Sequence, residues 1–128
     1  MRRAHGERAT RGLLGSAEPP TAILYDNDVM AAAGLGAAQR LGISVPSGVS
    51  IVSWDDSALC ELMHPALTAL RRDIAGAGGQ AARMLQQMAA GGRPENFEEA
   101  PAILEIRDSS GVAGVPQIAV PRRSRLTA

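Results

Sequence analysis

Short apolar runs alternate with helix-compatible stretches along most of the chain. The apolar runs predict strands at Thr21–Tyr25, Val49–Trp54, Ala66–Arg71 and Pro101–Arg107. Apolar residues at helical spacing predict helices at Ala4–Leu14, from Val29 to about Leu41, at Asp55–Met63 and from Ile74 to about Ala90. This alternating order predicts an α/β fold, namely a Rossmann-like, mostly parallel sheet with flanking helices.

Two of the predicted strands end at clusters of polar residues. Asp26-Asn27-Asp28 follows Tyr25 directly, and Asp55-Asp56 follows Trp54, which ends a run apolar enough to be covered by helices on both sides. Because ligands in an open parallel sheet lie outside the carboxyl ends of its strands, we expect a binding site at this edge. Aromatic residues are scarce, with one Trp, one Tyr and one Phe, and the Trp and the Tyr end these two strands.

Polyol recognition is the first interpretation of this edge. A carboxylate accepts hydrogen bonds from two sugar hydroxyls, and an amide offers both a donor and an acceptor. An aromatic face covers the apolar side of a pyranose or ribose ring. These groups are supplied at neighbouring strand ends by Asn27, Asp55, Tyr25 and Trp54.

Helix capping is the second interpretation, and it applies to individual residues. A short carboxylate accepts hydrogen bonds from the free N–H groups of a helix's first turn. Asp28 and Asp56 are therefore interpreted as N-caps of the helices that follow them. Asn27 and Asp55 each precede such a cap by one residue, which leaves their side chains for a ligand.

Phosphoryl chemistry is the alternative function. The sequence ILYDNDV looks like the nucleophile loop of haloacid-dehalogenase-type phosphatases, in which Asp26 would attack phosphorus and Asp28 would act as the acid/base. The later acidic pair could then hold magnesium. Such enzymes neutralise the phosphate with a cation, usually Lys. The chain has no Lys, so Arg71 or Arg72 would have to substitute, and we prefer the binding interpretation.

Charge and composition narrow the classes of function. The formal net charge is zero, so no overall field attracts nucleic acid or an anionic membrane, and no apolar run is long enough to span a bilayer. The single cysteine, Cys60, excludes an internal disulfide and a Cys-based zinc site, and we expect no metal and no cofactor. We therefore expect a soluble cytoplasmic protein with one domain over residues 1–110 and a disordered Gly/Pro-rich tail over 111–128.

Three motifs occur in a fixed order: ND-x-M-A at a helix start, an apolar strand that ends in W-D-D, and the crossover LT-x-L-R-x-D. They lie within the segments PTAILYDNDVMAAAGLGAAQRLGISVP, VSIVSWDD and HPALTALRRDIAGAGGQAARML, and PAILEIRDSS follows. Together these segments cover about Pro20–Ser110 and resemble the C-terminal part of the ligand-binding domain of LacI/GalR family transcriptional regulators. The resemblance implies one lobe of a type I periplasmic-binding-protein-like fold, with a sugar or nucleoside-like effector in the cleft between two lobes.

The resemblance also implies roles for individual residues. Asn27 and Asp55 match positions that commonly contact the effector, and Arg72 matches the hinge crossover and joins the candidate ligand set. The implied dimer contacts are Leu59, Cys60, Leu62 and Met63. By this resemblance the chain is not an enzyme but the effector-binding and dimerisation portion of a sugar-responsive regulator.

The remainder of the family pattern lies outside this sequence. Met1 falls well inside the family's ligand-binding domain, so we expect a truncated form with no DNA binding of its own. It would act as a homodimer or as a heterodimer with a full-length regulator. The helix from Ile74 to about Ala90 would belong to the missing lobe, which leaves its apolar stripe with nothing to cover.

Overall fold

The computed structural model describes residues 2–93 and 96–112. In this part of the chain the helices and strands follow the predicted order, and each of the four strands is shorter than predicted. They are α1 (Arg2–Leu14), β1 (Ala22–Tyr25), α2 (Asp28–Arg40), β2 (Ser50–Ser53), α3 (Ala58–Leu62), β3 (Thr68–Arg71), α4 (Ile74–Ala89) and β4 (Ile103–Glu105). The predicted tail, residues 111–128, lies outside the described residues from position 113 onward.

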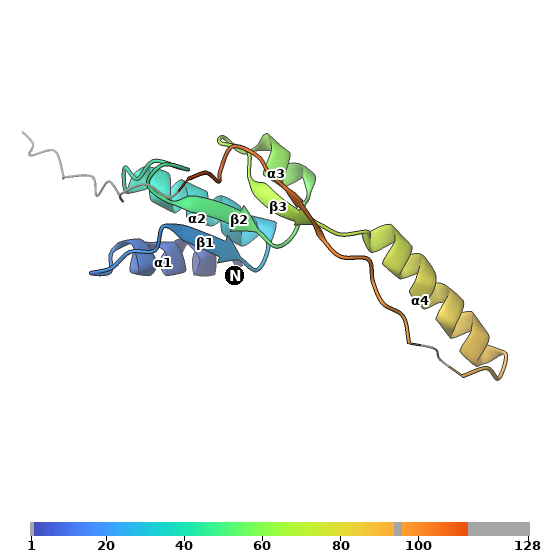
Figure 1. The fold of residues 1–128 in the computed structure, drawn as a ribbon. Helices are drawn as coiled ribbons and strands as arrows, with labels where there is room; N and C mark the ends of the chain where they lie inside the picture. The colour runs from blue at the N-terminus through green and yellow to red at the C-terminus, as the bar shows by residue number, and fades with distance from the viewer. Residues whose placement is uncertain (1, 94–95, 113–128) are drawn as a thin grey trace, which may run out of the picture.

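The sheet has the strand order β1-β2-β3-β4 (Figure 1). β1 pairs with β2 and β2 with β3 in parallel, whereas β4 runs antiparallel to β3. β4 reverses direction because the chain leaves β3, runs out along α4 and returns beside β3 without crossing the sheet (Figure 1). The predicted mostly parallel sheet is therefore confirmed.

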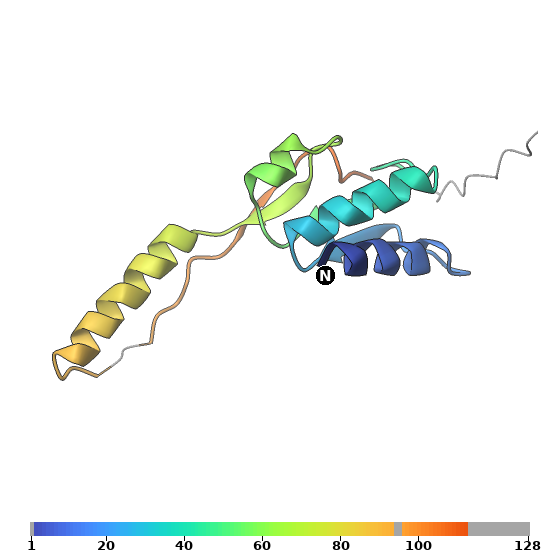
Figure 2. The same cartoon turned by 180° about the vertical axis from the view of Figure 1, so that it is seen from behind.

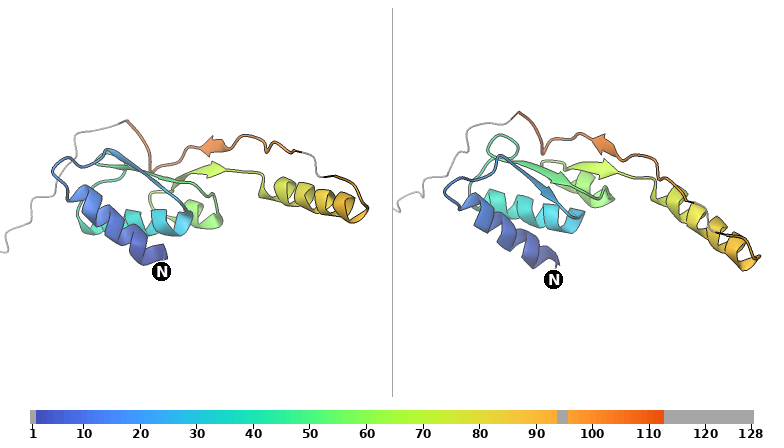
Figure 3. Two further views of the ribbon diagram at one scale, coloured as in Figure 1. Left: turned by 90° about the horizontal axis from the view of Figure 1, so that it is seen from below. Right: turned by 60° about the horizontal axis from the view of Figure 1, so that its bottom comes forward.

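The core lies between one face of the sheet and the helices. Figure 3 shows α1, α2 and α3 on the same side of the strands. Ile23 of β1 and Ile51 of β2 are buried beneath these helices, with Leu35 of α2 fully buried against them. On the opposite face Val52 of β2 is partly buried and Leu24 of β1 is 56% exposed, and Figure 3 shows no helix on that side among the described residues. The prediction that helices cover both faces of β2 is therefore wrong for the described chain. The apolar run at β2 is explained by one covered face and a second face that is only partly shielded.

Close contact between α1 and α2 depends on two glycines. A Cβ at Gly6 of α1 would meet the backbone of Met30, and a Cβ at Gly34 of α2 would overlap the phenol of Tyr25. The Tyr25 hydroxyl lies 2.6 Å from the Thr10 hydroxyl, which itself donates to the carbonyl of Gly6. Tyr25 is thus the donor of this pair, and it joins β1 to both helices.

The Ser109 segment closes the gap between β2 and β3. Its N–H donates to the carbonyl of Ala66, its carbonyl accepts from the N–H of Ile51, and its hydroxyl donates to the carbonyl of Ile51. The same hydroxyl accepts from the N–H of Thr68 at 2.8 Å. Ser109 is fully buried. Its contacts therefore provide hydrogen-bond partners for backbone groups of β2 and of the chain at the start of β3 that do not pair with each other.

Helix α4 projects away from the rest of the described chain (Figures 1 and 2). It buries no residue, and its apolar residues Ile74 and Leu85 are 62% and 66% exposed. This agrees with the expectation that the stripe has nothing to cover. No helix in the described residues is long and apolar enough to cross a membrane.

Substitution of Gly34 and of Gly12 by alanine is expected to change the stability of the protein in opposite directions. We expect Gly34→Ala to lower the free energy of unfolding by about 1–3 kcal/mol, because the new methyl group would overlap the Tyr25 ring. Gly12→Ala on α1 meets open space and is expected to raise it by up to about 1 kcal/mol through helix propensity. Urea unfolding followed by circular dichroism measures both changes; equal effects at the two positions would contradict the packing argument.

Candidate functional site

The parallel strands bring a set of polar side chains to one edge of the sheet, which we call the polar edge. It comprises Asn27 after β1, Trp54, Asp55 and Asp56 after β2, and Arg71 and Arg72 at the end of β3. The exits of β1 and β2 are joined where the N–H of Trp54 donates to the carbonyl of Tyr25 at 2.9 Å. The polar edge lies at the end of the sheet from which α4 departs (Figure 1).

Asn27, and not Asp28, caps helix α2. Its side-chain oxygen accepts a hydrogen bond from the N–H of Met30 at 3.0 Å, and Asn27 is only 5% exposed. Asp28 is the first residue of the helix and accepts from the hydroxyl of Ser57, which in turn caps α3 in place of the predicted Asp56. The amide nitrogen of Asn27 makes no hydrogen bond within the described residues, so it is left as a possible donor.

Asp55 and Arg72 form the exposed pair of the polar edge. Arg72 Nη2 lies 3.5 Å from Asp55 Oδ1, and the two side chains are 35% and 45% exposed. The turn that carries Asp55 is stabilised by the Ser53 hydroxyl, which donates to the Asp55 carbonyl at 2.7 Å. Trp54 beside it is 45% exposed. A carboxylate and a guanidinium thus lie in contact at the polar edge, and the indole of the neighbouring residue in sequence is also accessible there.

One predicted ligand contact, Tyr25, and one predicted dimer contact, Cys60, point into the core and not toward the surface. Tyr25 is 4% exposed and bonded to Thr10, and burial raises the pKa of its phenol. Side chains alternate along a strand, so Tyr25 shares the helix-covered face with Ile23 and cannot cover a sugar. Cys60 is fully buried with its thiol donating to the Asp55 carbonyl, and burial raises its pKa, so it is not a surface contact for a dimer.

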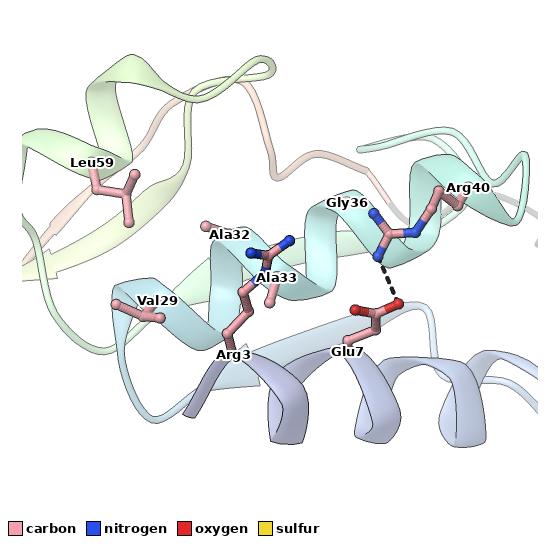
Figure 4. Close-up of a pocket in the computed structure, with 8 residues that line it drawn as sticks. All are labelled: Arg3, Glu7, Val29, Ala32, Ala33, Gly36, Arg40 and Leu59. Carbon is pink, nitrogen blue, oxygen red and sulfur yellow. Dashed lines mark ion pairs between the residues drawn. The ribbon is translucent and has the colours of Figure 1, made fainter. Parts of the chain in front are cut away.

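The other predicted dimer residues differ in exposure. Leu62 is 77% exposed, and Met63 packs against the core as a partly buried residue. Leu59 lines a groove of about 360 Å³ between α1, α2 and α3 (Figure 4). The apolar floor of this groove is formed by Val29, Ala32, Ala33 and Gly36. On its rim Glu7 of α1 pairs with Arg40 of α2 at 2.9 Å, as Figure 4 shows.

Asp56 is held by arginines that sequence reasoning did not connect with it. Arg107 Nη1 and Nη2 donate to the two Asp56 carboxylate oxygens at 2.8 and 3.1 Å, and Arg71 Nε donates at 3.3 Å. The hydrogen bond from Arg107 lowers the pKa of Asp56, with Arg71 adding to the effect and burial opposing it. The only sequence signal for Arg107 was its place in the PAILEIR strand, because the pair spans 51 residues.

A second groove, of about 310 Å³, adjoins the polar edge. It is lined by Arg71, Arg72, Asp73, Ala100, Pro101 and Ile103. Arg72 therefore faces both Asp55 and this groove. In residues 2–93 and 96–112, no three His, Cys, Asp or Glu side chains cluster closely enough to hold a metal ion.

Two of the carboxylates named by the phosphatase alternative make hydrogen bonds within the described residues. Asp28 accepts from Ser57 and from the N–H of Val29, and Asp56 is bound by two arginines. Both carboxylates therefore have structural partners in this arrangement.

The fold is that of an α/β lobe with a parallel sheet, a type of fold in which ligands bind outside the carboxyl ends of the strands. A family model described as the periplasmic binding protein-like domain matches residues 2–110. The chain belongs to this family, within which it corresponds to the effector-binding part of LacI-type transcriptional regulators. The predicted resemblance and fold class are confirmed, and nothing in these comparisons supports a phosphatase.

Both curated and solved relatives are regulators of this type. The HTH-type transcriptional regulator MalR of Streptomyces coelicolor is 33% identical over 111 residues, which cover 87% of this chain and 31% of MalR. The Escherichia coli repressor PurR is 32% identical over 104 residues, covering 80% of this chain and 30% of PurR. The chain thus spans about a third of the length of these relatives, both of which are named as transcriptional regulators.

Solved structures agree with the sequence relatives. A LacI family regulator from Bifidobacterium animalis subsp. lactis superposes with a TM-score of 0.81 at 42% identity, covering 88% of this chain and 41% of that one. The regulator CelR, solved in complex with cellobiose, has a TM-score of 0.76 at 28% identity, covering 84% of this chain and 33% of CelR.

The Asp56 ion pair predicts a pH-dependent loss of stability. We expect Asp56→Asn to lower the free energy of unfolding at neutral pH by about 3 kcal/mol, because Arg107 loses the partner of a largely buried pair. The folded-state pKa of Asp56 is depressed, so its contribution is present above the unfolded-state pKa and is lost as the pH falls through the folded-state value.

Urea titrations of the wild type and Asp56→Asn from neutral to acidic pH measure this contribution. The difference between the two proteins should shrink as the solution is acidified. Asp26→Asn, at an exposed position of the preceding turn, is the matched control and should leave stability unchanged. A difference that stays constant across the pH range would contradict the assignment.

Proposed function

We propose that the polar edge binds a neutral, hydroxyl-rich effector, a sugar or nucleoside-like molecule. The observation that carries the proposal is the half-exposed Asp55–Arg72 pair beside the exposed Trp54. Asp55 would accept hydrogen bonds from vicinal hydroxyls, and Arg72 would donate to a hydroxyl or ring oxygen. The indole of Trp54 would cover the apolar face of the ring. The donor of Asn27 and the groove lined by Arg72 support the same interpretation.

The comparisons support a sugar as the first ligand to test. CelR is named in complex with cellobiose, and its similarity to this chain covers 84% of this chain and 33% of CelR. In this proposal the 128 residues contribute effector contacts and no catalysis. Specific DNA recognition belongs to an HTH part of the kind that the names of MalR and PurR record.

Removal of the Asp55 carboxylate tests the binding proposal. We expect calorimetry with a panel of neutral sugars, starting with cellobiose, to find a ligand of the wild-type chain. Asp55→Asn should weaken its binding about tenfold to a hundredfold, the scale of one or two charge-assisted hydrogen bonds. Asp26→Asn serves as the control and should bind normally. Equal affinity of the Asp55→Asn variant and the wild type would contradict the assignment.

We also propose that the groove between α1, α2 and α3 contacts a second copy of this chain. Leu59 and Val29 line the groove, and Leu62, which is on the same short helix α3 as Leu59, is 77% exposed. The arginine and glutamate side chains around the floor give the polar rim that such interfaces have. A full-length regulator of the same family would present a matching surface for a heterodimer.

Introduction of a charge at this surface tests the second-copy proposal. We expect Leu62→Asp to weaken self-association more than about tenfold in sedimentation velocity, because the carboxylate would be buried without a partner. Leu85→Asp places the same substitution on α4 at a position that is 66% exposed, and it should leave self-association unchanged. Equal weakening by both variants, or none by either, would argue against this interface.

A further inference from the structure

The two neighbouring aspartates of the polar edge have different surroundings. The Asp55 side chain is 45% exposed, whereas that of Asp56 is only 7% exposed. Both follow β2 in the same turn, so without a fixed turn either carboxylate could take the exposed position. An element that holds Asp56 inward would therefore decide which carboxylate is presented.

Arg107 is placed to hold Asp56. Its guanidinium forms two parallel hydrogen bonds with both carboxylate oxygens, at 2.8 and 3.1 Å, and also donates to the Leu67 carbonyl at 2.8 Å. It lies 3.5 Å from Glu61 on α3. A planar fork of this kind fixes the orientation of a carboxylate, which a single ammonium group does not.

The backbone of Arg107 is itself anchored to the sheet. Its N–H donates to the Thr68 hydroxyl at 3.0 Å, and that hydroxyl lies 3.3 Å from the Arg107 carbonyl. Thr68 is 1% exposed and belongs to β3. The guanidinium therefore reaches Asp56 from a fixed point of the sheet and not from a free loop, and its side chain is only 14% exposed.

Arg71 adds a second, weaker connection. It lies 3.3 Å from Asp56 and 3.0 Å from Glu105 of β4, so it bridges the turn after β2 and the returning strand. Its side chain is 54% exposed, so water weakens both contacts. Arg107 thus supplies the main restraint on Asp56, and Arg71 supports it.

We infer that Arg107 is a positioning residue that keeps Asp56 turned inward and thereby presents Asp55, beside Trp54, as the carboxylate of the polar edge. The part of this inference that concerns a ligand rests on the proposed sugar binding. The part that concerns the turn does not, because Arg107 contacts Asp56 directly.

Trp54 reports on the turn directly, since it is the only Trp in the chain. We expect Arg107→Met to shift the emission maximum of Trp54 and to change its quenching by acrylamide. Arg107→Lys keeps the charge without the two-pronged contact and should shift both signals in the same direction. Arg83→Lys and Arg83→Met on α4, where the arginine bonds only to Gln80 among the described residues, should shift neither.

Arg107→Lys also guards against simple unfolding. If Arg107→Met fails to fold by circular dichroism, the comparison of Arg107→Lys with Arg83→Lys still decides the question. Unchanged Trp54 signals in a folded Arg107→Lys variant would overturn the inference, since charge alone would then suffice.

The sugar titration separates this inference from the proposed function. For a sugar that the wild type binds, Arg107→Lys should weaken binding about tenfold, a factor that corresponds to about 1.4 kcal/mol. Retained affinity together with shifted Trp54 signals would overturn the role toward the ligand. If the wild type binds no sugar while the Trp54 signals shift as expected, the proposed function fails and the positioning of the turn is supported.

Discussion

Parallel pairing of β1, β2 and β3 determines where the residues that follow these strands lie. Strands that run in the same direction must all end at the same edge, and Trp54 closes that edge by donating to the carbonyl of Tyr25. The polar residues that follow each strand then meet across short distances although they are far apart in sequence. Asp55 and Arg72, which are 17 residues apart, meet at the polar edge for this reason.

Sequence reasoning located the elements well because their signals are local. The order of the elements and the mostly parallel sheet follow from apolar periodicity, and the start of α4 at Ile74 was predicted to the residue. The errors at Asp28 and Asp56 have a common origin. Several polar residues stand in a row at each helix start, and only the backbone geometry selects Asn27 and Ser57 as the caps. The inward direction of Tyr25 could have been obtained from strand alternation, since Ile23 shares its face.

The roles of Arg107 and Ser109 were not predictable from local pattern. Both act across more than 40 residues, and both depend on β4 returning antiparallel beside β3. Without that return, Asp56 would be a carboxylate with one exposed arginine, and the predicted capping role would be reasonable. The polar edge is thus specified by a tertiary feature that periodicity does not encode.

The place of Ser109 between β2 and β3 has a consequence for how the chain is synthesised. The α1–β1–α2–β2 unit can form before β3 and β4 leave the ribosome, because its contacts are sequentially close. The opening between β2 and β3 cannot be filled until Ser109 has emerged, 58 residues after its partner Ile51. Completion of the sheet is therefore a late event, because it requires contacts between residues far apart in the sequence. A nascent chain that stops before Ser109 exposes unpaired strand backbone to neighbouring molecules.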